Sequence, residues 1–258
     1  MIKFDVKVAD ELFTVICAQP RTKSFFEDFL TGEQGGTVLC VTGKWREHIR
    51  SLVMQNESLR GVSLPPFRVE YLAIHEMMAR ALIERGVLLV HGAAVVANGS
   101  AVMFVAPSGT GKSTHTRLWT ELPGKNAFII NDDKQFIRLN GQGATVYATP
   151  WGMISPTPAV RSAPLKAIVL LRRGENRIAP AEEAALFPEM IKASLRGNTP
   201  REAIQLLELH KRLLAVTEHY QMDCQPDLSA AEMAYNAVFG GGESIDTDYG
   251  ARHETGYH

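Results

Sequence analysis

A glycine-rich segment in the middle of the chain limits its fold more than any other feature. The segment Ala106-Pro107-Ser108-Gly109-Thr110-Gly111-Lys112-Ser113 follows the apolar run 101–105 and precedes a stretch that is able to form a helix. Its pattern fits a phosphate-binding loop, the Walker A motif, with alanine in place of the usual first glycine. Such a loop joins a strand to a helix, so the sequence predicts a strand–loop–helix unit here.

The residue types of this segment suit a bound triphosphate. Small residues let the main chain approach the phosphates closely, and the following helix directs its N–H groups at the anion. Lys112 is expected to neutralise the β and γ phosphates of ATP, and the Ser113 hydroxyl to bind the accompanying Mg²⁺. The residues expected to bind the nucleotide are Ser108, Gly109, Thr110, Gly111, Lys112, Ser113 and Thr114.

A pair of acids follows the next apolar run. Residues 127–130 predict a short buried strand, and Asn131-Asp132-Asp133 ends it. Two adjacent carboxylates repel each other unless a cation or a proton separates them. Because successive side chains of a strand point to opposite sides, one acid can face a metal while the other faces a substrate. An Asp-rich turn that opens a hairpin is the alternative interpretation of this triplet.

The composition excludes several classes of protein. The chain has 258 residues, of which 27 are basic and 28 acidic, so a protein that binds nucleic acid by bulk charge is not expected. Cys17, Cys40 and Cys224 are too far apart to form a CxxC unit, and we expect them to be reduced structural thiols. The chain shows neither a signal peptide nor an apolar stretch of membrane-spanning length, which predicts a soluble cytoplasmic protein without a membrane partner.

The pattern along the chain predicts a small N-terminal lobe over residues 1–66 and a larger domain over 67–240. Residues 2–8, 12–17 and 37–42 have the alternation of strands, and the prolines in 62–67 indicate a boundary. Asn98-Gly99 and Asn140-Gly141 each predict a hairpin, and residues 166–171 predict a buried strand. Helices are predicted over 70–85, from the capping box at Thr199 to about 214, and from a second box at Ser229 to about 239. The tail 241–258 is expected to be disordered.

Three pieces occur in order along the larger domain: Val90-His91-Gly92 before a hairpin, the glycine-rich loop, and Asn131-Asp132-Asp133. With this order and spacing, the chain resembles the HPr kinase/phosphorylase family and its relatives that share the nucleotide-binding core of phosphoenolpyruvate carboxykinase. The resemblance covers about residues 87–148. It implies an α/β fold of α+β character, in which a P-loop core with a mixed sheet and flanking helices accompanies the small N-terminal α/β lobe.

The resemblance also implies a role for each site residue. Lys112, His91 and Asp132 would be catalytic, with His91 near the reacting phosphate and Asp132 as the general base for a substrate hydroxyl. Ser113 and Asp133 would bind the metal, or Asp133 would orient His91. The sequence leaves the division of roles between the two aspartates open, and His91 taken alone is more typical of a hydrogen-bonded structural histidine.

These residues predict a Mg²⁺-dependent kinase that moves the γ-phosphoryl group of ATP to a hydroxyl. The acceptor would be a small molecule or a serine of a peptide or protein, since some HPr kinase-like relatives phosphorylate peptides during natural-product maturation. One alternative is a nucleotide-binding regulatory module with little turnover, and a carboxykinase-type lyase is a third candidate. HPr kinases assemble as oligomers, so the resemblance allows a homo-oligomer.

Other residues near these motifs are weaker candidates. Thr149-Pro150-Trp151-Gly152 either lines the acceptor pocket or forms a turn anchored by its aromatic ring. The remaining candidates are basic residues that could face phosphate but equally suit ordinary surface or helical positions, namely Arg161, Arg177, His115 and Arg117.

Overall fold

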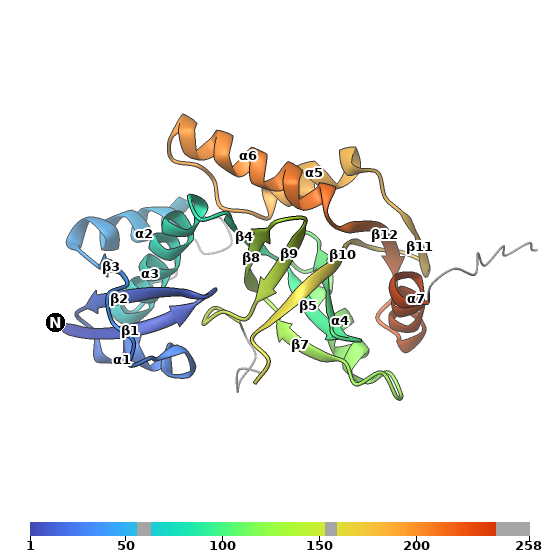
Figure 1. The fold of residues 1–258 in the computed structure, drawn as a ribbon, viewed down its shortest axis with the longest axis horizontal. Helices are drawn as coiled ribbons and strands as arrows, with labels where there is room; N and C mark the ends of the chain where they lie inside the picture. Colours follow the sequence, from blue (N-terminus) through green and yellow to red (C-terminus); the bar gives the residue numbers. More distant parts are fainter. Residues whose placement is uncertain (56–62, 153–158, 241–258) are drawn as a thin grey trace, which may run out of the picture.

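The computed structural model describes residues 1–55, 63–152 and 159–240 (Figure 1). The tail that was expected to be disordered lies outside the described residues, as does Val62 of the expected boundary. The elements of the N-terminal part are β1 (Ile2–Val8), β2 (Glu11–Cys17), α1 (Pro20–Ser24), the 3₁₀ helix η1 (Glu27–Phe29), β3 (Thr37–Cys40), α2 (Gly43–Gln55) and α3 (Pro66–Ile83). In the described part, β1 pairs antiparallel with β2, and β2 pairs parallel with β3.

The rest of the chain forms a second, larger mixed sheet with helices on its faces. Its elements are β4 (Val87–His91), β5 (Ala93–Ala97), β6 (Ser100–Val105), α4 (Lys112–Thr120), β7 (Phe128–Asn131), β8 (Lys134–Asn140), β9 (Gly143–Tyr147), β10 (Ser162–Arg173), β11 (Arg177–Pro180), α5 (Glu183–Lys192), α6 (Pro200–Ala215), β12 (Glu218–Cys224) and α7 (Leu228–Phe239). Among the described residues the strand order is β4-β8-β9-β10-β6-β5-β7, and β12 pairs with β10 and β11. The expected α/β fold with a mixed sheet and flanking helices is confirmed.

The sheet is covered on both faces, because its strands alternate between two apolar cores. Leu88 of β4 and Ile137 of β8 pack in the core beneath α5 and α6, whereas Leu89 and Phe136 point to the core shared with α3 and the N-terminal strands. Farther along the sheet, β5, β6, β10 and β12 pack against α4 and α7. Figure 1 shows α5 and α6 together above the strands, with α7 beyond β12. The division at residue 66 stays a prediction, since one apolar core joins the N-terminal strands to β4 and β8.

Both predicted Asn-Gly hairpins are present. Asn98 and Gly99 join β5 to β6 with φ angles of 49° and 72°, and Gly141, with φ 58°, lies between β8 and β9. Positive φ at these positions is the reason that asparagine and glycine are favoured there.

Two helix starts differ from the prediction. Pro66 is the first residue of α3, four residues before the predicted start. Proline is tolerated there because the N–H groups of a first turn have no partner within the helix. The start of α7 was predicted two residues too late. Asp227 is its N-cap and accepts a hydrogen bond from the Ala230 N–H at 2.8 Å, while Ser229 lies inside the helix. The cap of α6 by Thr199 is confirmed, with the Glu202 N–H donating to its hydroxyl at 3.1 Å.

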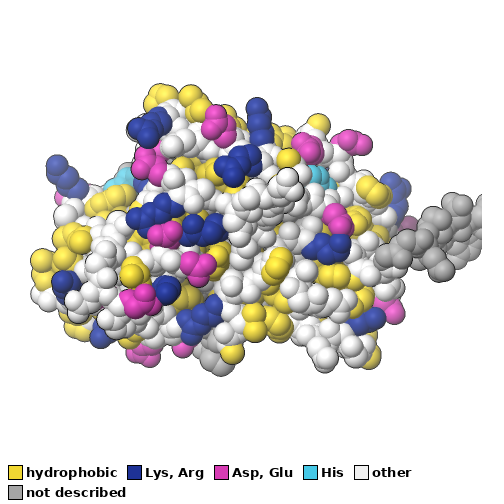
Figure 2. Space-filling view, viewed as in Figure 1, with side chains coloured by type: hydrophobic (Ala, Val, Ile, Leu, Met, Phe, Trp, Pro, Cys, Tyr) yellow, Lys and Arg dark blue, Asp and Glu magenta, His cyan; other side chains and the backbone are white. Residues whose placement is uncertain are grey.

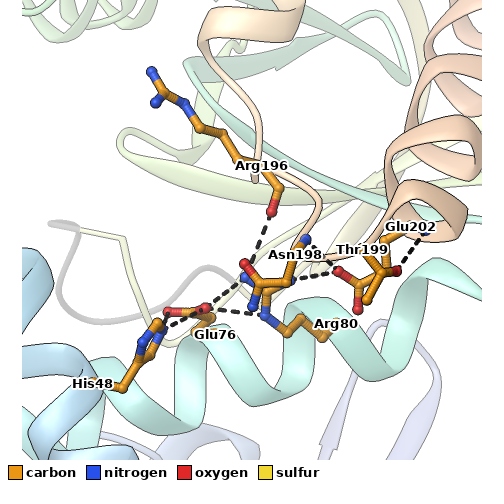
Figure 3. A network of polar contacts seen from close by, with 7 residues as sticks. All are labelled: His48, Glu76, Arg80, Arg196, Asn198, Thr199 and Glu202. Carbon is orange, nitrogen blue, oxygen red and sulfur yellow. Dashed lines mark hydrogen bonds and ion pairs between the residues drawn. The ribbon is translucent and has the colours of Figure 1, made fainter.

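A network of charged side chains joins α2, α3 and α6 (Figure 3). Glu76 of α3 binds Arg80 at 2.6 Å and His48 of α2 at 3.0 Å, and Arg80 binds Glu202 of α6 at 2.8 Å. Glu202 also accepts a hydrogen bond from the Asn198 N–H at 2.7 Å. The network therefore fixes the segment between α5 and α6, which pairs with β4 through the Val90–Ser194 bridge.

Charges of both signs are distributed over the surface. On the face shown in Figure 2, Lys and Arg side chains lie interspersed with Asp and Glu, as the nearly equal totals of 27 and 28 lead one to expect. Among the described residues, none of the helices combines the length and the apolar character needed to cross a bilayer.

Candidate active site

The glycine-rich loop lies at one edge of the larger sheet, where several strands end. The loop follows β6, and β10 runs parallel to both β6 and β12. Since β6 and β7 are both antiparallel to β5, β7 has the same direction as β6. The C-terminal ends of β6, β7, β10 and β12 therefore meet at this edge, which is where α/β proteins bind their ligands.

The loop conformation depends on two glycines. Gly109 and Gly111 have φ angles of 78° and 121°, which other residues rarely adopt. A Cβ at either position would meet no atom within 4 Å, so glycine is needed here for its backbone freedom and not for space.

The helix after the loop begins without a side-chain cap. Gly111 is the N-cap of α4 and makes no side-chain capping bond, in contrast to Thr199 of α6 and Asp227 of α7. The first N–H groups of a helix have no partner within the helix, and the helix dipole places partial positive charge there. The start of α4 thus offers N–H donors and positive potential to an anion.

Lys112 is held under the loop. Its side chain is 7% exposed, and its Nζ donates a hydrogen bond to the Ala106 carbonyl at 2.9 Å. Burial lowers the pKa of Lys112, and the Asp133 carboxylate opposes that change. The ammonium group therefore lies within electrostatic reach of Asp133, and in the described structure it is bound to the neutral Ala106 carbonyl.

Asn131 shapes the turn that carries the two aspartates. Its Oδ1 accepts hydrogen bonds from the N–H groups of Asp133 at 3.0 Å and Lys134 at 3.1 Å. Its amide Nδ2 donates to the Thr149 hydroxyl at 3.0 Å, and that hydroxyl donates to the Lys134 carbonyl. The side chain of Asn131 is buried, so the turn is fixed from both sides. Asp132 and Asp133 are both partly exposed.

His91, Asp133 and Lys134 form a charged group beside this turn. His91 and Lys134 are paired directly across β4 and β8. The Nε2 of His91 lies 3.3 Å from Asp133 Oδ1, and the Lys134 ammonium lies 3.4 Å from Oδ2. Burial lowers the pKa of His91, the Lys112 and Lys134 charges lower it further, and Asp133 opposes them. His91 is therefore neutral near pH 7.

Gly92 lets β6 pass close to this group. A Cβ on Gly92 would lie 2.8 Å from the Phe104 carbonyl oxygen, a distance that real side chains do not show. The Gly92 N–H donates to the Asp133 carbonyl at 3.0 Å. The His-Gly pair thus fastens the aspartate turn to the strand that leads into the loop.

The donor set suits Mg²⁺ only together with a phosphate ligand. In the described ranges, no cluster of three or more His, Cys, Asp or Glu side chains could hold a metal. Mg²⁺ in phosphoryl-transfer sites is usually held by one or two carboxylates, substrate phosphates and water. The Ser113 hydroxyl and the two aspartates are oxygen donors of this kind, so they fit a metal that arrives with a nucleotide.

A cleft of about 470 Å³ opens beside the loop. Its wall is formed by the loop and α4 on one side and by the ends of β10 and β12 on the other, with the residues Gly109, Thr110, Gly111, Thr114, His115, Arg173, Gly174, Cys224, Gln225 and Pro226. Cavities of roughly 300–1,000 Å³ accommodate small-molecule ligands. The cleft therefore adjoins both the glycine-rich loop and the start of α4.

Arg173 is a site residue that the sequence analysis missed. Its guanidinium group donates to the carbonyls of Gly109 and Thr110. Arg173 reaches the loop because β10 is parallel to β6, and no local pattern in the sequence indicates that pairing. Lys134 was missed as well, although its place directly after the two aspartates was a usable signal.

The weaker candidates are distributed over the molecule. Arg161 donates to the Asp28 carbonyl and lies over the Phe29 ring, so it contacts η1 of the N-terminal part. Arg177 is an exposed residue on β11, and Arg117 is exposed on α4. Trp151 is buried against Tyr71 and His75 of α3, so the turn 149–152 is anchored by its aromatic ring. His115 is buried in the cleft wall.

Comparisons with known proteins add little to these observations. No family model matches the chain, and no curated protein matches it in sequence. Among solved structures, the Hpr(Ser) kinase/phosphatase from Coxiella burnetii is similar to 60% of this chain, with 99% of that chain covered, at 9% identity and a TM-score of 0.37. A likeness of this degree decides nothing about activity.

Proposed function

We propose that the protein is a phosphotransferase that binds MgATP and moves its γ-phosphoryl group to a hydroxyl of a small molecule, peptide or protein. One observation carries the proposal. The lysine of the glycine-rich loop lies within electrostatic reach of the aspartate turn, and that turn binds His91 at 3.3 Å. A Walker A loop and carboxylates that can hold Mg²⁺ or take a proton recur in phosphoryl-transfer sites. Here the neutral His91 lies beside them.

Each part has a distinct task in the reaction. The phosphates lie on the loop N–H groups at the start of α4, and Lys112 leaves the Ala106 carbonyl to bind the β and γ phosphates. Ser113 and one aspartate would hold Mg²⁺, which would supply charge neutralisation when bound with ATP. His91, being neutral, donates or accepts a hydrogen bond near the γ phosphate.

Asp132 is the proposed general base. The acceptor oxygen forms a bond to the γ phosphorus while the bond from that phosphorus to the β–γ bridging oxygen breaks, and ADP leaves. The proton of the acceptor hydroxyl passes to the Asp132 carboxylate. Asp133 is assigned the orienting and metal-side role, because its two oxygens lie against His91 and Lys134.

A transfer assay with Asp132→Asn tests this assignment. The full chain is incubated with MgATP and a panel of serine peptides and small alcohols, and ADP and the phosphorylated product are measured by mass spectrometry. The variant should bind MgATP like the wild type but transfer roughly 100-fold more slowly or worse. Asp28→Asn, on the exposed η1, is the matched control and should transfer normally.

The same assay distinguishes the alternatives. Full transfer activity in Asp132→Asn would eliminate the base assignment. Tight MgATP binding without ADP or product, with every acceptor tested, would instead favour a regulatory nucleotide-binding module.

A further inference from the structure

His115 is a buried polar residue in the wall of the cleft that the proposed mechanism does not use. It lies on α4, one turn beyond the start of the helix, and is 3% exposed. Its ring packs edge-on against Phe104, with 4.7 Å between the ring centroids. The exposed side chains of Arg173 and Gln225 line the same cleft.

The contacts of His115 define which ring nitrogen carries the proton. The Trp119 indole Nε1 donates a hydrogen bond to the His115 Nε2 at 3.3 Å. An indole N–H can only donate, so Nε2 is the acceptor and the hydrogen of the neutral ring is on Nδ1. Since Nε2 carries no hydrogen, the ring is in its neutral form.

The Nδ1–H group is therefore a hydrogen-bond donor without an acceptor in the described structure. Within the described part of the chain, Nδ1 is buried and has no hydrogen-bond partner. A buried donor without an acceptor is unfavourable. His210 is the contrast, because it is equally buried and both of its nitrogens are paired, with the Leu206 carbonyl at 2.6 Å and the Ser194 hydroxyl at 2.7 Å.

The position of His115 favours the nucleoside over the phosphates as the acceptor. The phosphates have the loop N–H groups and Lys112, which lie in the loop and at the very start of α4. The cleft that His115 lines extends from the loop to the end of β12 at Cys224 and Gln225. A purine base in that space presents ring nitrogens, which accept hydrogen bonds.

We infer, on the basis of the proposed function, that His115 binds the base of the nucleotide by donating its Nδ1–H to an acceptor atom of the ring. A site built around such a donor rejects a ligand that lacks the matching acceptor, because the donor then stays unpaired. The cleft would thus bind the base, whereas the loop would bind the triphosphate.

Calorimetry with two probes separates these two contributions. MgATP and magnesium tripolyphosphate are titrated into the wild type, into His115→Phe, which keeps the ring but loses the donor, and into His115→Gln, which keeps an acceptor and a donor. We expect His115→Phe to weaken MgATP binding about tenfold and to leave tripolyphosphate within about twofold, and His115→Gln to recover most of the loss. His219→Gln, at the far end of β12, is the control and should not change either affinity.

Each other outcome has a defined meaning. Equal weakening of both probes by His115→Phe would show a structural role for the ring, and no weakening of either would show that the base does not use it. Either result overturns the inference and leaves the phosphotransferase proposal standing. If the wild type binds neither probe, the proposed function itself fails.

A second measurement does not depend on the variants folding. The His115 Nδ1–H resonance of the ¹⁵N-labelled wild type should shift when MgATP is added and not when magnesium tripolyphosphate is added. A resonance that responds to both probes alike, or to neither, would overturn the inference.

Discussion

His91 lies 3.3 Å from Asp133, Nε2 to Oδ1, across the turn that joins β7 to β8. The contact links the residue at the end of β4 to the second of the paired acids, and Lys134 binds the other oxygen of the same carboxylate at 3.4 Å. Besides burial, the charges of Lys112, Asp133 and Lys134 therefore influence the pKa of His91.

Replacing Lys134 should make His91 more basic. Burial lowers the pKa of His91, and the Lys112 and Lys134 charges lower it further. In Lys134→Met one of these charges is absent, so the pKa of His91 should rise and the ring should stay protonated to a higher pH. An NMR titration of the His91 ring protons measures the change.

Lys125→Met is the matched control for this titration, because Lys125 lies over the Tyr235 ring on another part of the surface. An unchanged or lower His91 pKa in Lys134→Met would contradict the electrostatic account of the site.

Arg173 should support the loop, and its neighbour Arg172 should not. Both are exposed at the end of β10, but the guanidinium of Arg173 donates to the Gly109 and Thr110 carbonyls. Losing these exposed hydrogen bonds in Arg173→Gln should weaken MgATP binding about fivefold, as a loss of about 1 kcal/mol implies. Arg172→Gln should bind normally. If the two variants lose affinity equally, net charge and not the loop contact is responsible.

His75 should make the fold sensitive to acid. Burial lowers its pKa to about 3, whereas the unfolded chain has the ordinary value near 6.5. Below pH 6.5 the unfolded state binds a proton that the native state does not, so stability is lost as the pH falls from about 6.5 toward 3. From pH 6.5 to 5 this residue should account for a loss of about 2 kcal/mol.

Urea unfolding at both pH values checks this expectation. His75→Phe keeps a ring against Trp151, whose centroid is 4.6 Å away, but cannot be protonated. The variant should lose about 2 kcal/mol less than the wild type between these pH values. The same loss in both proteins would show that His75 is not the responsible group.

Local sequence patterns were sufficient to predict the features whose conformation depends on residues adjacent in the chain. The Asn-Gly turns, the Thr199 cap and the strand–loop–helix unit each depend on a few consecutive residues, and all are present. That the acidic turn and the His-Gly pair lie near the loop was expected only from the resemblance to the HPr kinase/phosphorylase family. In the structure His91 lies 3.3 Å from Asp133.

Those local patterns could not predict which strands pair when the strands are far apart in the sequence. The last third was predicted to be mainly helical, and β12 was missed because its sequence, Glu-His-Tyr-Gln-Met-Asp-Cys, is polar and half-buried. Its parallel pairing with β10 places Cys224 opposite Arg173, and both residues line the cleft. At α7, Asp227 and Ser229 both suit a cap, and the hydroxyl of Ser229 donates to Asp227 instead of capping the helix.

Whether a triphosphate binds at the start of α4 is decided by titrating MgATP into the wild type and into Lys112→Ala in a calorimeter. We expect saturable heat at one site per chain for the wild type, and affinity at least about 100-fold lower for Lys112→Ala at unchanged thermal stability. Absence of binding by the wild type, or equal affinity in both proteins, would contradict a triphosphate held at the start of α4.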